Sequence, residues 1–139
     1  SYIIFNNYID SGSIRGGTRH QNSIINFIIK LKIETGYRVI HTGSKKDKEN
    51  DLRSYDFVDI DLRGLTSIAE MFHLCSLINV IYNVSFDGFQ MHLFFIKNKK
   101  SFIMFRGRLL KKNENYIKNC VNPPFEYSEN VKNLIEYIE

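Results

Sequence analysis

The chain has 139 residues, of which 43% are hydrophobic and 24% are charged, and its formal net charge is +4. This size and balance are typical of one ordinary folded domain, and they exclude a disordered, a collagen-like or a disulfide-rich protein. No apolar run approaches the roughly 18 residues that a membrane-spanning helix needs, and the first residues do not resemble a signal peptide. The chain begins with Ser rather than Met, so we expect it to be part of a longer protein.

The cysteines and the charge indicate the setting in which the chain works. Cys75 and Cys120 have no motif spacing, which predicts reduced thiols in a cytoplasmic protein, with Cys75 in the core. The positive charge fits an anionic partner, such as a nucleotide, a nucleic acid or a membrane surface. The alternative is that the heavy use of Asn, Ile and Lys reflects an AT-rich genome rather than selection for a function.

The first third of the chain predicts two strands around one helix. A short β-type run predicts a strand over residues 2–6, and a loop rich in Gly and Ser follows over 10–17. Helical spacing of apolar residues predicts a helix over 22–35 that ends at Gly36, because glycine readily adopts the conformation of a helix C-terminus. A second strand is expected over 37–42.

The middle of the chain predicts a strand and a capped helix. The charged segment 45–53 is expected to be a loop with a short helix, and apolar alternation predicts a third strand over 57–62. Thr66 or Ser67 caps the next helix, which runs to about residue 78 with Glu70 as the acidic partner of a capping box. The remaining elements are a strand over 80–84, a helix over 90–97, a strand over 101–105 and a last helix over 128–139.

Strict alternation of strands and helices predicts an α/β fold. We expect a Rossmann-like, doubly wound parallel sheet of about five strands, with right-handed crossovers and helices on both faces, in one domain over residues 1–139. Ligands of such sheets bind at the carboxyl ends of the strands, near the point where the strand order reverses. The loops that follow the strands are therefore the candidates for function.

The loop after the first strand has the composition of a phosphate-binding loop. Its glycines allow close backbone approach, the hydroxyl of Ser13 can donate a hydrogen bond, and Arg15 and Arg19 can hold phosphate oxygens. It matches neither the P-loop nor the dinucleotide-binding fingerprint. A solvent-exposed loop without a ligand is the alternative.

Two further loops carry candidate groups. In the turn Asp87–Gly88 and the helix start Phe89–His92, backbone N–H groups would face the crevice, with the carboxylate and the imidazole as hydrogen-bonding partners of a ligand. The alternatives are that Asp87 only caps the helix and that His92 is a core histidine. Gly43 and Ser44, which follow the second strand, can form another anion-contacting turn.

Other charged groups give weaker predictions. Asp59 and Asp61 lie on one face of a strand, which fits a cation site or, more simply, a solvated face. No His, Cys or carboxylate spacing matches a zinc site, so we expect neither a metal nor a cofactor. The basic residues between 97 and 112 match no nucleic-acid motif, so no nucleic-acid partner is expected. They form a solvated face or an anionic-membrane contact.

Three segments, in order, resemble a known family. Residues 39–47 resemble a strand followed by Gly-Ser, residues 61–71 resemble Asp-Leu-x-Gly-x-Thr-Ser-Leu-x-Glu-Leu, and residues 87–93 resemble Asp-Ser/Thr-Gly-Pro-Met-His-Leu. These are segments of the bacterial heptosyltransferase-like glycosyltransferases, which are similar to glycosyltransferase family 9. The resemblance covers roughly residues 2–107.

The resemblance implies the C-terminal, nucleotide-sugar-binding half of a two-domain GT-B enzyme. Asp87, Met91 and His92 match the motif, and its diphosphate-binding turn falls on Gly88 and on Phe89 and Gln90, which stand in place of Gly and Pro. The implied donor is a nucleoside-diphosphate or CMP sugar, bound as substrate. The implied acceptor is a glycan or a lipid-linked glycan, as in lipopolysaccharide or capsule synthesis.

The implied reaction is metal-independent, inverting sugar transfer. Its catalytic base is expected in an N-terminal domain outside this chain, so we expect the chain alone to bind donor weakly and not to turn over. The implied location is the cytoplasm, or the periphery of the inner membrane. The alternative function is a non-catalytic Rossmann-like module for protein interaction or membrane docking.

Overall fold

The fold was analysed in a computed structural model, which describes residues 1–7, 17–86, 88–104 and 120–121. Most of the loop after the first strand, Asp87, the basic residues 106–112 and the expected helix over 128–139 lie outside the described residues. The elements, in order, are β1 (Tyr2–Asn6), α1 (Gly17–Thr35), β2 (Arg38–His41), α2 (Lys45–Asn50), β3 (Ile60–Asp61), α3 (Ile68–Ser76), β4 (Val80–Phe86), α4 (Phe89–Ile96), β5 (Lys100–Met104) and β6 (Cys120–Val121).

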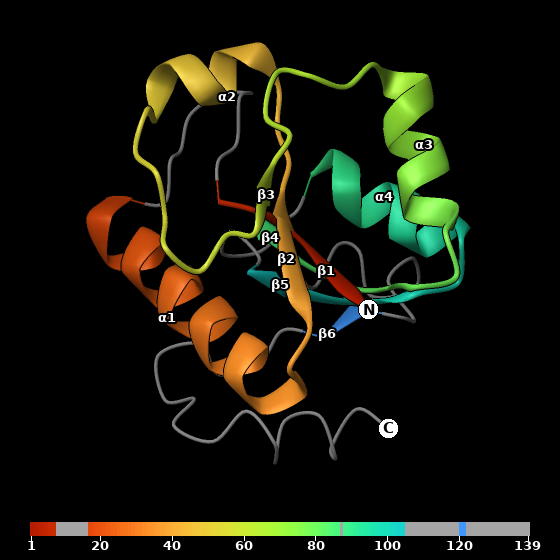
Figure 1. The fold of residues 1–139 in the computed structure, drawn as a ribbon, viewed down its shortest axis with the longest axis horizontal. Helices are drawn as coiled ribbons and strands as arrows, with labels where there is room; N and C mark the ends of the chain where they lie inside the picture. The colour runs from red at the N-terminus through yellow and green to blue at the C-terminus, as the bar shows by residue number, and fades with distance from the viewer. Residues whose placement is uncertain (8–16, 87, 105–119, 122–139) are drawn as a thin grey trace.

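The strands form one parallel sheet in the order β3-β2-β1-β4-β5-β6. Helix α1 lies on one face of the sheet, and α3 and α4 lie on the other (Figure 1). The first five strands in the order 3-2-1-4-5, with alternating helices on both faces, make the fold Rossmann-like, which confirms the predicted fold class.

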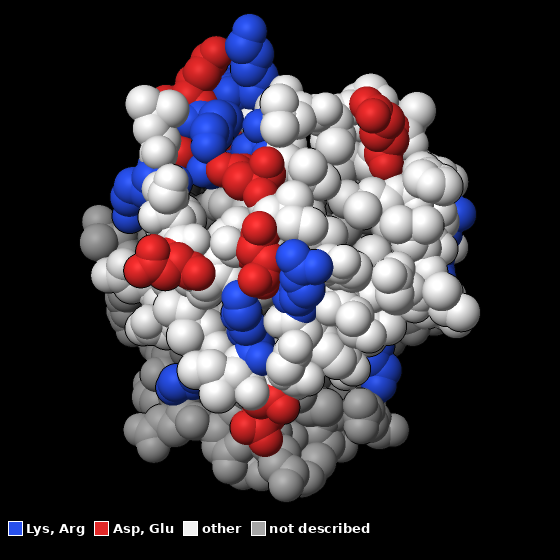
Figure 2. Space-filling view, viewed as in Figure 1, with Lys and Arg blue, Asp and Glu red and all other residues white. Residues whose placement is uncertain are grey.

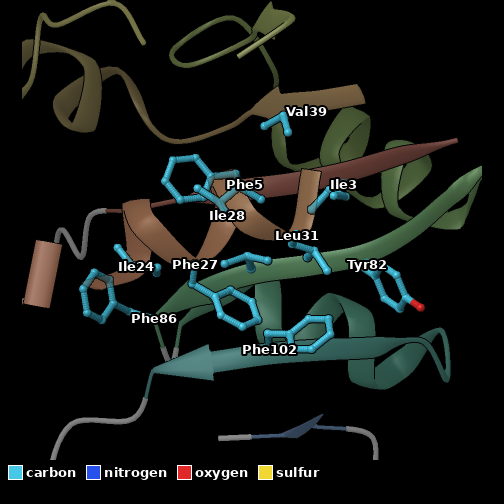
Figure 3. Packing of buried hydrophobic residues seen from close by; sticks show 11 residues of the cluster. Ile3, Phe5, Ile24, Phe27, Ile28, Leu31, Val39, Tyr82, Phe86 and Phe102 are labelled. Carbon is cyan, nitrogen blue, oxygen red and sulfur yellow. The ribbon is translucent and has the colours of Figure 1, made fainter. Parts of the chain in front are cut away.

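The larger core lies between α1 and the sheet. Helical spacing places Ile24, Ile28 and Leu31 on one stripe of α1, and this stripe packs against Phe5 of β1 and Phe102 of β5 (Figure 3). Burial of such apolar side chains contributes about 1.5–3 kcal/mol each before the entropy cost of folding is subtracted. This packing holds the carboxyl ends of the strands in fixed positions relative to one another.

The smaller core lies under α3 and α4. Ile4 and Val80 from the sheet contact Met71 and Cys75 of α3 and Phe94 of α4. The prediction that Cys75 lies in the core is therefore confirmed, whereas the side chain of Cys120 lies outside the described residues. No described helix is both long enough and apolar enough to cross a bilayer.

Several element boundaries differ from the predicted ones. Helix α1 begins five residues early, at Gly17, because its first turns lack the apolar residues that define the pattern. Strand β3 has only two residues. Phe57 and Val58, which were predicted to belong to it, lie outside any strand and pack against the larger core. Strand β6 was not predicted, because two residues give no periodic signal.

Candidate functional site

The strand order reverses at the carboxyl ends of β1 and β4. The chain passes from β1 to β2 on one side, and β4 then pairs with β1 on its other side. A crevice outside these strand ends is the usual ligand position in such sheets. The groups that meet there come from Asn7 after β1, from the turn after β2 and from the start of α4.

The start of α4 presents part of the predicted motif to solvent. Gly88 is the residue at the helix N-terminus and has no side chain to cap it; a β-carbon built there meets no heavy atom within 4 Å. Phe89 is 49% exposed, and His92, one turn later, is also exposed. The alternative that His92 is a core histidine is therefore wrong.

The other three described residues of the motif point inward. Gln90, Met91 and Leu93 are buried, while Asp87 lies outside the described residues. The helix start therefore divides between a solvent-facing set, Gly88, Phe89 and His92, and a set that anchors α4. The positive end of the α4 dipole lies at the solvent-facing set.

The turn after β2 already holds an anion, which is the carboxylate of the chain's own Asp47. Ser44 Oγ accepts a hydrogen bond from Asp47 N at 3.0 Å, and Asp47 Oδ2 accepts one from Ser44 N at 2.8 Å. A β-carbon on Gly43 would lie 2.7 Å from Asp47 Oδ2, so a larger residue there would displace this carboxylate. In the structure this turn contacts the carboxylate of an internal side chain, as part of the capping box of α2.

A directed chain of hydrogen bonds ends at the buried His41. His41 Nε2 lies 3.0 Å from Asn7 Oδ1, Asn7 Nδ2 donates to the hydroxyl of Tyr55 at 3.3 Å, and that hydroxyl donates to Asp51 Oδ2 at 2.6 Å. With the amide of Asn7 oriented to donate to Tyr55, its Oδ1 faces His41, and this pairing assigns the imidazole proton to Nε2. Burial, and then the positive charge of Arg63, lower the pKa of His41 to about 4.

Arg63, which sequence reasoning missed, fastens the segment between α2 and β3. Its buried guanidinium donates to the carbonyl oxygens of Asp51 at 2.6 Å and Arg53 at 3.1 Å, and it pairs with Asp61 at 3.0 Å. Burial alone would raise the pKa of Asp61, but hydrogen bonds from Arg63 and Lys48 outweigh it and hold that pKa well below its usual range. Arg63 lies between a predicted strand and a predicted helix cap, and nothing in its neighbours along the sequence signals burial.

A second group of residues, which were not predicted as site residues from the sequence, forms a polar floor beneath the start of α4. We use the term polar floor for Thr42, Asn83, Ser85 and Ser101, which are buried on the sheet face that α4 covers. Asn83 and Ser85 alternate with apolar residues along β4, and that period of two was the available signal.

The remaining predictions divide by position. Ser13 and Arg15 lie outside the described residues, and Arg19 lies in the first turn of α1 with its side chain outside them. Asp59 lies just before β3 and pairs with Lys32 at 2.8 Å, and Asp61 of β3 pairs with Lys48 at 2.7 Å. The described part of the chain contains no group of three or more His, Cys, Asp or Glu residues placed to hold a metal ion.

Comparison with protein-family models and with curated proteins finds no match for the chain. The fold and the geometry at the carboxyl end of the sheet therefore carry the functional argument.

Proposed function

We propose that the chain binds the nucleoside-phosphate part of a sugar donor at the start of α4, as the donor half of a glycosyltransferase. The observation that carries the proposal is the solvent-facing set Gly88, Phe89 and His92 at the point where the strand order reverses. These three residues belong to the segment that resembles the donor-binding motif of heptosyltransferase-like enzymes.

The chemistry at this position suits a phosphate group. Backbone N–H groups in the first turn of a helix point along its axis, and together with the helix dipole they attract anions. His92, one turn into α4, is close enough along the helix to contact the same ligand. The exposed ring of Phe89 offers an apolar surface beside the phosphate position.

The proposed role of the chain in the reaction is to stabilise the leaving group. An acceptor hydroxyl attacks the anomeric carbon, the bond from that carbon to the phosphate oxygen breaks, and the nucleoside phosphate leaves. The negative charge that develops on the leaving oxygen is stabilised by the start of α4. The base that takes the proton of the acceptor hydroxyl belongs to a second domain in this proposal.

The test is the thermal stability of the chain with UDP, GDP, ADP or CMP. A ligand at ten times its Kd stabilises the folded state by about 1.4 kcal/mol, which raises Tm by several degrees. We expect one nucleotide to give this shift, and His92→Ala or Asp87→Ala to remove it. His73→Ala is the matched control, because His73 is also exposed and lies on α3. If no nucleotide raises Tm, the proposal fails.

A second candidate function is protein interaction, and one observation favours it. An apolar groove of about 410 Å³ runs along α3, lined by Leu62, Thr66, Ala69, Glu70, His73, Leu74 and Leu77. The α3 side of the molecule carries few charges in Figure 2. This function would be indicated if no nucleotide bound while the chain self-associated in sedimentation and Ala69→Glu abolished that association.

A further inference from the structure

The side chain of Gln90 links the polar floor to α4. We infer that Gln90 is a positioning residue, which holds the first turn of α4 in the orientation that a phosphate ligand requires. The inference rests on the proposed function, because it concerns the same site. It assigns a role to a side chain that does not itself face the ligand.

The side-chain amide of Gln90 is fixed in one orientation by two buried partners. Gln90 Oε1 accepts a hydrogen bond from the hydroxyl of Thr42, and Gln90 Nε2 donates to Asn83 Oδ1 at 2.9 Å. Thr42 and Asn83 are both fully buried, and Gln90 is 5% exposed. An amide with both ends bonded and no access to water does not rotate.

The floor continues beyond Asn83 into the next strand. Asn83 Nδ2 donates to Ser85 Oγ at 3.0 Å and to Ser101 Oγ at 3.3 Å, and Ser85 Oγ donates to the carbonyl oxygen of Phe86 at 2.8 Å. Asn83, one of the two partners of Gln90, is thus itself held by residues of β4 and β5.

The Gln90 bridge spans the place where the strand order reverses. Thr42 follows β2 and Asn83 lies in β4, and β1 lies between these two strands in the sheet. Thr42 is also fixed by its backbone, since its N–H donates to the carbonyl oxygen of Phe5 at 2.9 Å. The first turn of α4 is therefore tied to the residue after β2 and to β4, the two strands that flank β1.

Burying the amide of Gln90 has a desolvation cost that an apolar residue would avoid. Burying an amide is unfavourable unless every polar atom is paired, whereas Met at this position would fill a similar volume without that requirement. Unlike an apolar side chain, the amide makes two directional hydrogen bonds, and these fix the orientation of the first turn of α4. Contacts to a phosphate depend on such placement, since small displacements of a binding group weaken it strongly.

The test compares nucleotide affinity among Gln90→Met, Thr42→Val and the double variant, with Thr42→Ser as the matched control that keeps the hydroxyl. The probe is the nucleotide that stabilises the wild-type chain, titrated by calorimetry at a temperature where each variant is fully folded. We expect each single variant to weaken nucleotide binding about 5- to 20-fold. The double variant should bind no more weakly than the single variant with the lower affinity, because both substitutions break the same bridge. Thr42→Ser should bind like the wild type.

Hydrogen exchange gives a second readout that needs no ligand. The N–H of His92 donates to the carbonyl oxygen of Gly88 at 3.3 Å, in the first turn of α4. We expect this amide to exchange faster in Gln90→Met, while the N–H of Met71, which donates to Ser67 O at the start of α3, exchanges as in the wild type.

The possible failures are distinguishable. If the wild type binds a nucleotide and the folded variants bind it equally well, Gln90 is not a positioning residue, and the proposed function stands. If the wild type binds no nucleotide, the proposed function fails and the inference fails with it. If Gln90→Met does not fold, Thr42→Val carries the test, because it removes one hydroxyl without changing the shape of the side chain.

Discussion

His41 is the residue at which burial and protonation conflict most strongly. Its pKa is lowered from 6.5 to about 4 by burial and by the positive charge of Arg63. The folded state therefore binds this proton less readily than the unfolded state does. The stabilisation from a neutral His41 is fully present above pH 6.5 and is lost as the pH falls from 6.5 towards 4.

We predict that acidification over this range lowers the free energy of unfolding by up to about 3 kcal/mol through His41 alone. Urea unfolding at pH 7.5, 5.5 and 4.5 measures the change. The variant His41→Gln should be less stable at pH 7.5 but should lose most of the pH dependence. Equal pH dependence in the two proteins would show that His41 does not carry the effect.

Asp47 is the residue that the sequence did not identify as the partner of the turn at Gly43 and Ser44. The turn at Gly43 and Ser44 has the composition of an anion contact, and the structure places an anion there, but it is the carboxylate of Asp47. A pattern of small residues identifies the kind of group that a turn accepts. It does not say whether the chain itself supplies that group.

At the scale of elements, the sequence predicted the helix α3 and left its cap open between Thr66 and Ser67. Ser67 is the cap, with Glu70 completing the capping box. The hydroxyl oxygen of Thr66 is buried and has no hydrogen-bond partner among the described residues. The two neighbouring hydroxyls therefore contribute differently to stability.

We predict that Ser67→Ala lowers the free energy of unfolding by about 1 kcal/mol, because it removes the acceptor for Glu70 N. Thr66→Val should leave stability unchanged or raise it slightly, since it replaces an unpaired hydroxyl by a methyl group. Chemical denaturation of both variants makes the comparison, with the exposed Ser54→Ala as a control for loss of a hydroxyl. A larger loss in Thr66→Val than in Ser67→Ala would contradict this assignment.

The elements that periodicity predicted well are those with one apolar stripe. Helix α1 has such a stripe and was predicted apart from its first turns, whereas β3 and β6 are too short to show any period. The bridge from Thr42 to Gln90 joins residues 48 positions apart, so it depends on how β2 and α4 meet in the folded chain. No pattern within either segment of the sequence predicts the contact between Thr42 and Gln90.

For the whole molecule, Cys75 reports on the stability of the fold. Its side chain projects from α3 and is fully buried in the smaller core, and burial raises the pKa of its thiol to about 11. Both effects suppress the reactive thiolate, so the thiol reacts when the chain opens and not in the closed state.

We predict that in the variant Cys120→Ser the remaining thiol reacts with a chromogenic disulfide reagent slowly in buffer and at once in concentrated urea. A bound nucleotide should slow the reaction in buffer further, because it stabilises the folded state. Absorbance of the released thiolate follows the reaction. Immediate reaction of one thiol per chain in buffer would show that Cys75 is reachable in the folded state.

The charge pairs along β3 have a consequence for how the chain behaves among other copies of itself. β3 is an edge strand, and an open edge invites a strand from another molecule to pair with it. Here the edge is two residues long; the ion pair Lys48–Asp61 includes its last residue, and the pair Lys32–Asp59 lies just before it. Figure 2 shows charged side chains of both signs down the middle of this face. A strand arriving from a second copy would have to displace these ion pairs, so this edge of the sheet resists edge-to-edge aggregation.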